Sequence, residues 1–127
     1  MKISILGTGA YGMAIASVLH YNKHSIKMWT NSNEEANYLN ANRKSPKINY
    51  DIPSDIIIST NMKDVVSDSD VIIFATPSEF VDGVSKELSN YYNNQYIGIT
   101  SKGIDNKSLL CLSDVVKMNI STDLIAV

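Results

Sequence analysis

Short runs rich in β-branched side chains alternate along this chain with longer amphipathic stretches. This alternation is typical of βαβ units, in which a helix connects two parallel strands. Val71–Ala75 carries no polar side chain, as expected of a central strand buried on both faces. The sequence therefore predicts an α/β fold with a doubly wound parallel sheet. Strands are expected at Lys2–Leu6, Ser25–Trp29, Ile56–Thr60, Val71–Ala75, Tyr96–Thr100 and Asp123–Val127, and helices at Met13–Tyr21, Asn33–Ala41 (capped by Asn33), Met62–Ser67, Ser78–Asn90 and Lys107–Met118.

The composition restricts the classes of protein to which such a chain can belong. With 127 residues, 44% of them hydrophobic and 19% charged, it is expected to form one globular domain over residues 1–127. A net charge of −2 argues against a nucleic-acid partner. The single cysteine, Cys111, excludes a disulfide framework and a cysteine-rich zinc site, and its leucine neighbours predict that it is buried. No apolar run approaches the roughly 20 residues that span a bilayer, so we expect a cytoplasmic protein. No metal site is expected either.

A glycine-rich turn, Gly7-Thr8-Gly9-Ala10-Tyr11-Gly12, follows the first predicted strand and opens the first predicted helix. This is the context in which G-x-G-x-x-G binds a dinucleotide. The first glycine allows a tight turn, the second lets a pyrophosphate approach the backbone, and the third lets helix and strand pack closely. Amide groups at the helix N-terminus then receive the phosphate charge. The turn predicts a dinucleotide-binding domain of the Rossmann type.

The sequence lacks, at the expected position, the residues that usually determine whether a site prefers NAD or NADP. An NAD site commonly has Asp or Glu about 20 residues after the turn, and an NADP site has Arg nearby. Between Thr8 and Asn33 the chain contains neither. Thr30, Asn31 and Ser32 end the second predicted strand instead, and these neutral groups do not repel a 2′-phosphate. The cofactor is NADP or NAD, with NADP favoured.

Four strings along the chain carry a resemblance to a known family. The strings Ile5–Ala14 and Met28-Trp29 are similar to the opening and to the end of the second strand in the N-terminal domain of glycerol-3-phosphate dehydrogenase. The fourth-strand exit, Ala75–Phe80 (ATPSEF), and the string Ser101–Asp105 (SKGID) after the fifth strand resemble the family in turn. The resemblance covers essentially all 127 residues.

The resemblance implies roles for individual residues. Asn31 would lie near the adenosine ribose, and Pro77 and Phe80 would line the cofactor beside the fourth strand. Lys102 matches the lysine of the family that contacts substrate and cofactor, and its ammonium can stabilise charge on the substrate oxygen during hydride transfer. Nothing is carried over to Asn42–Pro53, where this chain departs from the family pattern. The pyrophosphate would be held by the turn residues Gly7, Thr8, Gly9, Ala10, Tyr11 and Gly12.

The resemblance also implies an activity, the reduction of dihydroxyacetone phosphate to sn-glycerol 3-phosphate, which feeds phospholipid synthesis. The chain ends on its sixth predicted strand, so we expect the front part of a longer protein. A second catalytic lysine, the groups that bind the substrate phosphate and a possible homodimer contact would lie in a C-terminal helical domain, and the chain alone would be inactive. Two alternatives stay open. One is another dehydrogenase with the same front domain, such as a ketopantoate reductase or a 6-phosphogluconate-dehydrogenase-like enzyme; the other is a non-catalytic nucleotide-sensing module.

Overall fold

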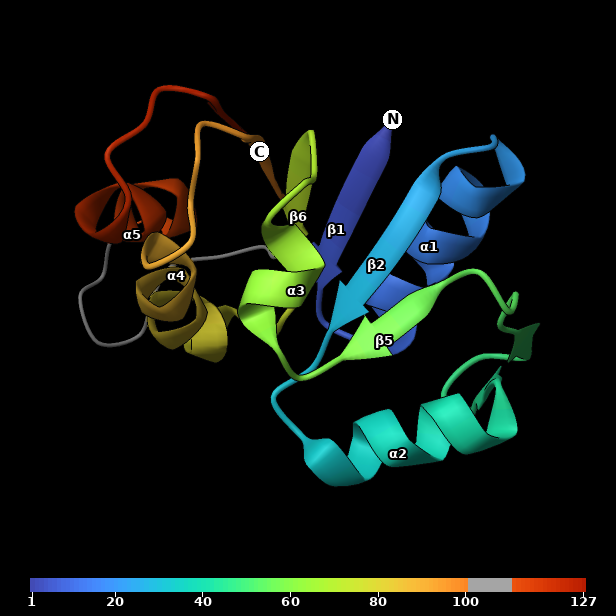
Figure 1. The fold of residues 1–127 in the computed structure, drawn as a ribbon. Coiled ribbons are helices and arrows are strands. Elements are labelled where there is room, and N and C mark those ends of the chain that lie inside the picture. The colour runs from blue at the N-terminus through green and yellow to red at the C-terminus, as the bar shows by residue number, and fades with distance from the viewer. Residues whose placement is uncertain (101–110) are drawn as a thin grey trace.

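A parallel sheet of six strands forms the centre of the computed structural model, which describes residues 1–100 and 111–127 (Figure 1). The strands lie in the order β5-β2-β1-β6-β7-β8, and every neighbouring pair is parallel. This order confirms the predicted doubly wound sheet. The first two strands have the predicted bounds, and the others are one to three residues shorter. The bounds are β1 (Lys2–Leu6), β2 (Ser25–Trp29), β5 (Ile57–Ser59), β6 (Val71–Phe74), β7 (Tyr96–Ile99) and β8 (Ile125–Ala126).

Helices cover the sheet through two apolar clusters. One cluster joins α3, α4 and α5 to the sheet, and the other joins α1 and α2 to it. Ile5 and Leu6, neighbours in β1, belong to different clusters because successive side chains of a strand point to opposite faces. No described helix is long and apolar enough to cross a membrane. The bounds are α1 (Ala10–Tyr21), α2 (Asn33–Asn42), α3 (Met62–Val66), α4 (Val81–Ser89, after a 3-10 turn at Ser78–Phe80) and α5 (Leu112–Asn119).

The starts or caps of three helices differ from the prediction, and for one of them part of the predicted helix lies outside the described residues. Helix α1 begins at Ala10 rather than Met13, so the end of the glycine turn belongs to the helix. Ser32, not Asn33, caps α2, because its Oγ accepts the Glu35 N–H at 3.1 Å. In α5 the first helical residue is Leu112, and residues 107–110 of the predicted helix lie outside the described residues.

Two predictions of burial are wrong. Cys111 is exposed, because it stands before the first turn of α5 rather than on the packed face of the helix. Val71 and Ile73, predicted to be buried, are half-buried. Both side chains lie at the border of the cluster that joins α1 and α2 to the sheet, and they pack against it without being enclosed by it.

A short antiparallel hairpin, β3 (Lys44–Ser45) with β4 (Tyr50–Asp51), follows α2 and was not predicted. Arg43 ends α2 with a left-handed φ of +50°. Its guanidinium donates to the carbonyl of Pro53 and, at 2.7 Å, to that of Ile56, which ties the hairpin base to the segment before β5. Burial raises the pKa of Tyr50 in this hairpin, and the Asp55 carboxylate adds to the rise. The hairpin positions its turn, which includes Lys47, near the glycine turn at the carboxyl end of β1.

Candidate cofactor site

The loops at the carboxyl ends of β1 and β6 run in opposite directions. The chain leaves β1 through α1 toward β2, and it leaves β6 through α4 toward β7 on the other side. Such a divergence between adjacent parallel strands opens a crevice outside their carboxyl ends, where doubly wound sheets bind ligands. The glycine turn lies at this point.

Gly7 makes the tight turn that the motif predicts. Its φ of +132° is a backbone conformation that side chains disfavour. A Cβ here would lie 2.6 Å from the carbonyl oxygen of Ala75, the residue after β6. Its N–H donates to the carbonyl of Trp29 at 2.8 Å, at the end of β2. The backbone of Gly7, directly after β1, thus lies in contact with the ends of β2 and β6, and a residue with a side chain does not fit there.

The other two glycines differ in their surroundings. A Cβ on Gly12 would lie 2.3 Å from the Gly7 carbonyl oxygen, so this glycine lets α1 pack against the turn. Around Gly9, the N-cap of α1, the nearest atom to an added Cβ is the Lys47 Nζ, at 4.0 Å. The first amides of a helix lack partners within the helix, and those of α1 begin at this open residue. The arrangement presents N–H groups beside free space, which suits a phosphate group.

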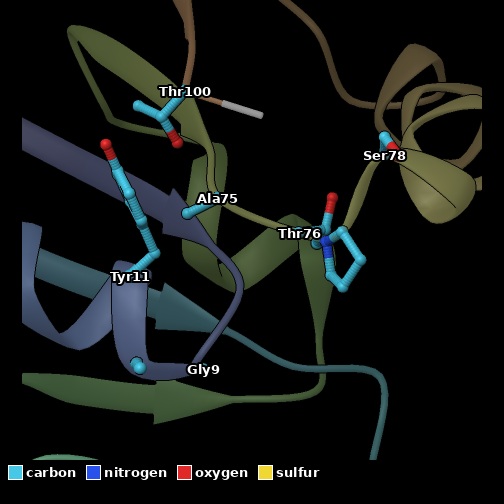
Figure 2. A pocket seen from close by; sticks show the side chains of 8 residues that line it. Gly9, Tyr11, Ala75, Thr76, Ser78 and Thr100 are labelled. Atoms are coloured by element: carbon cyan, nitrogen blue, oxygen red, sulfur yellow. The ribbon is translucent and has the colours of Figure 1, made fainter. Parts of the chain in front are cut away.

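Two cavities meet at this turn. One, of about 440 Å³, lies on the β7 side and is lined by Ala10, Tyr11, Ser78 and Thr100. Figure 2 shows the side chains of Tyr11 and Thr100 around it. The other, of about 260 Å³, lies on the β2 side. The residues common to both are Gly9, Ala75, Thr76 and Pro77. A ligand of two halves joined at a central group would fit across them.

The β2-side cavity is lined by an aromatic side chain, by neutral polar groups, and by one acidic and one basic side chain. Trp29 is 5% exposed and donates from Nε1 to the carbonyl of Thr60 at 3.0 Å, so it is a packed strand residue. Asn31 lies beside it at the end of β2. Glu35 reaches the cavity from the first turn of α2, and Lys47 reaches it from the β3–β4 turn. The buried Thr8 hydroxyl donates to the Glu35 carboxylate.

Sequence reasoning missed Glu35 and Lys47 as cavity residues. The Ser32-x-x-Glu35 spacing is that of a capping box, so the start of α2 could have been found from it. The contact between Glu35 and Thr8 joins residues 27 apart and has no local signal. Lys47 lies in the segment where the chain departs from the family pattern. Among the described residues no group of three or more His, Cys, Asp or Glu could hold a metal ion.

The predicted site residues group around the two cavities as follows. Gly12 packs behind the turn and lines neither cavity. Lys102 lies outside the described residues. Phe80 is half exposed and forms part of the β2-side wall. Ala10 and Tyr11 line the β7-side cavity. Those that line the β2-side cavity, some of them shared, are Gly7, Thr8, Gly9, Asn31, Pro77 and Phe80.

A family profile described as the N-terminus of NAD-dependent glycerol-3-phosphate dehydrogenase matches residues 2–127. The chain belongs to this family. The glycerol-3-phosphate dehydrogenase (NAD(P)+) of Orientia tsutsugamushi is 39% identical over 122 residues, which are 92% of this chain and 36% of that protein. The enzyme of the same name from Fusobacterium nucleatum is 34% identical over 120 residues, again 92% of this chain and 36% of that protein. The predicted family is confirmed, and the chain spans little more than a third of these relatives.

Solved structures confirm the fold of this glycerol-3-phosphate dehydrogenase family member. The glycerol-3-phosphate dehydrogenase of Coxiella burnetii superposes with a TM-score of 0.88 at 21% identity, over 98% of this chain and 38% of that one. A putative 2-dehydropantoate 2-reductase from Enterococcus faecalis reaches 0.71 at 19% identity, over 98% and 39%. The fold is therefore shared by several kinds of dehydrogenase, and the family assignment rests on the sequence profile.

Proposed function

We propose that this chain is the cofactor-binding domain, residues 1–127, of an enzyme that reduces dihydroxyacetone phosphate to sn-glycerol 3-phosphate with NADH or NADPH. The observation that carries the proposal is the glycine turn of a glycerol-3-phosphate dehydrogenase family member, with one cavity on each side of it. A dinucleotide has the matching form, two nucleotide halves joined by a pyrophosphate. The proposal leaves the choice between the two cofactors open.

The residues at the turn fit such a cofactor. Open space in front of Gly9 admits a pyrophosphate to the first amides of α1, and Lys47 adds a positive charge 4.0 Å from the position of a Gly9 Cβ. The adenosine half would occupy the β2-side cavity, beside Asn31, and Pro77 and Phe80 would form its far wall. The nicotinamide half would then lie in the β7-side cavity, beside Tyr11 and Thr100. The bound cofactor supplies the hydride.

The protein's part in the reaction is to position the substrate and to stabilise charge. We include Lys102 in the proposal as the residue that does both, on the strength of the family resemblance and of its place shortly after β7. Its ammonium would donate a hydrogen bond to the carbonyl oxygen of the substrate, and would hold the negative charge that grows there as the carbonyl carbon is reduced.

The remaining functions would belong to a further part of the protein, because this chain spans little more than a third of its relatives. A helical domain would supply a second lysine, the groups that bind the substrate phosphate and a homodimer contact. A cytoplasmic location completes the proposal, together with a supply of product to phospholipid synthesis, which the resemblance implies. Cell fractionation, together with lipid labelling in cells that lack the gene, tests these two points.

The enzymatic proposal is tested by the oxidation of NADH and of NADPH, with and without dihydroxyacetone phosphate, on the complete protein that contains this chain. We expect oxidation that depends on this substrate. Lys102→Ala should lower kcat by about two orders of magnitude or more, as loss of an oxyanion-stabilising donor does elsewhere. Lys117→Ala, which removes an exposed lysine of α5, is the matched control and should leave the rate unchanged. A folded protein that binds nucleotide but oxidises neither cofactor would refute the proposal and favour a sensing module.

A further inference from the structure

The Glu35 carboxylate does not make the contact that its position in α2 would usually give it. Glu35 is the third residue of the helix, and its N–H donates to the cap residue Ser32. In a capping box, a glutamate at this position accepts the N–H of the cap residue in return. Here the Ser32 N–H donates instead to the Thr30 Oγ1, at 3.2 Å. The carboxylate turns to the glycine turn and accepts a hydrogen bond from the buried Thr8 hydroxyl.

This orientation puts an acid in the cavity at the carboxyl end of β2. Glu35, Thr30 and Asn31 line the same space. In dinucleotide-binding folds, an acid near the end of this strand accepts hydrogen bonds from the adenosine ribose. No acid occurs between Thr8 and Asn33, so the sequence alone favoured NADP. The structure supplies the carboxylate from the neighbouring helix, and the Thr8 bond occupies only part of its capacity, because a carboxylate accepts about four hydrogen bonds.

We propose that Glu35 recognises the adenosine ribose and makes this protein select NADH over NADPH. The inference rests on the proposed function, because it requires that the cavity holds the adenosine half of a dinucleotide. The carboxylate would accept hydrogen bonds from the ribose hydroxyls of NADH. A 2′-phosphate in the same place would bring a second group of negative charge against a half-buried carboxylate, and would have no hydroxyl to donate to it.

The positive charge in the cavity is placed to serve both cofactors equally. Lys47 approaches the turn at Gly9, with its Nζ 4.0 Å from the position of an added Cβ there. That is the place of the pyrophosphate, which NADH and NADPH share. The Arg43 guanidinium donates to the carbonyls of Pro53 and Ile56 and is not among the residues that line this cavity. Apart from Glu35 and Lys47, the described residues that line this cavity are neutral, so the sign of the selection falls to Glu35.

The experiment compares the dissociation constants of NADH and NADPH in the full chain and in two variants. Trp29 is the one tryptophan of the sequence and lines the β2-side cavity, so its emission reports binding directly. Glu35→Gln keeps the size of the side chain and removes its charge. Glu34→Gln removes the same charge from the neighbouring residue, which is exposed and lines neither cavity. The pair separates local contact with the ribose from a general change in net charge.

We expect the wild-type chain to bind NADH about tenfold or more tightly than NADPH, the worth of one hydrogen bond to a charged group. In Glu35→Gln this ratio should fall to near unity, and in Glu34→Gln it should stay as in the wild type. A wild-type preference for NADPH, or an equal change in both variants, would overturn the role of Glu35 while leaving dinucleotide binding intact. Failure of the folded wild-type chain to bind either cofactor would overturn the proposed function itself. The wild-type ratio requires no substitution, so the inference stays testable if a variant fails to fold.

Discussion

Gly12→Ala is the substitution that most directly tests the packing of the glycine turn. Gly12 is the third residue of α1, and an added Cβ would lie 2.3 Å from the carbonyl oxygen of Gly7 and 3.0 Å from its carbonyl carbon. Both contacts are with backbone atoms, so no rotation of a side chain relieves them. An ordinary contact begins at 3.4 Å, and α1 therefore has to move away from the turn by about 1 Å.

The energy of this change has two parts of opposite sign. Alanine stabilises a helix relative to glycine by up to about 1 kcal/mol. Forcing extra volume into a packed site costs about 1–3 kcal/mol. Gly83→Ala measures the first part alone, because Gly83 is likewise the third residue of its helix, α4, and an added Cβ there meets nothing within 4 Å. The helix gain is common to both variants, so their free energies of unfolding should differ by about 1–3 kcal/mol, with Gly12→Ala the less stable.

Urea unfolding of the two variants and the wild type, followed by circular dichroism, measures this difference. Gly83→Ala should be more stable than the wild type by about 0.5–1 kcal/mol. In thermal unfolding, a chain of this size should show about 3–5 °C of difference in Tm for each kcal/mol. If Gly12→Ala proved as stable as Gly83→Ala, the close approach of α1 to Gly7 would be wrong, and with it the stated role of the third glycine.

Three further outcomes are expected. For Gly9→Ala, the free energy of unfolding in urea should lie within about 0.5 kcal/mol of the wild-type value, because the added Cβ enters open space. Trp29 emission should nevertheless show NADH binding weakened about tenfold, because that space admits the pyrophosphate. Unchanged NADH binding would contradict the proposed site. Phe74→Ala should cost about 3–5 kcal/mol because Phe74 is fully buried, whereas Phe80→Ala, half exposed, should cost below about 1 kcal/mol by the same assay; equal losses would contradict the assigned core. The hydrogen bond from Lys27 and the charges of Lys27 and Lys2 lower the pKa of Asp68. The small contribution of the Asp68 carboxylate to the stability of the fold is therefore complete above the usual pKa of 3.8 and is lost as the pH falls below that value. The stabilities of wild type and Asp68→Asn in urea should therefore differ at neutral pH and converge in acid; a constant difference would exclude this ion pair as its source.

The sequence by itself determined the type and order of the helices and of the six strands of the parallel sheet, but not the β3–β4 hairpin. Strands β1 (KISIL) and β2 (SIKMW) match their predicted bounds because polar and apolar residues alternate in them and glycine or polar residues border them, which specifies extended backbone locally. The glycine turn was equally readable, since a positive φ at Gly7 and close packing at Gly12 each permit one residue type. The cap of α2 was misplaced by one residue because Ser32 and Asn33 are both good caps, and only the observed bond to Glu35 separates them.

Contacts between distant segments were decided by the tertiary structure alone. The exposure of Cys111 depends on where α5 begins, and the partial burial of Ile73 depends on its place at the border of the cluster that joins α1 and α2 to the sheet. Thr8 and Glu35 meet because β1 and β2 are adjacent and parallel, so that the segments after their carboxyl ends converge. Periodicity describes a residue's own helix or strand and carries no information on the partner across a cavity. For this reason the sequence shows no acid at the end of β2, and only the fold shows that α2 brings the Glu35 carboxylate to the glycine turn.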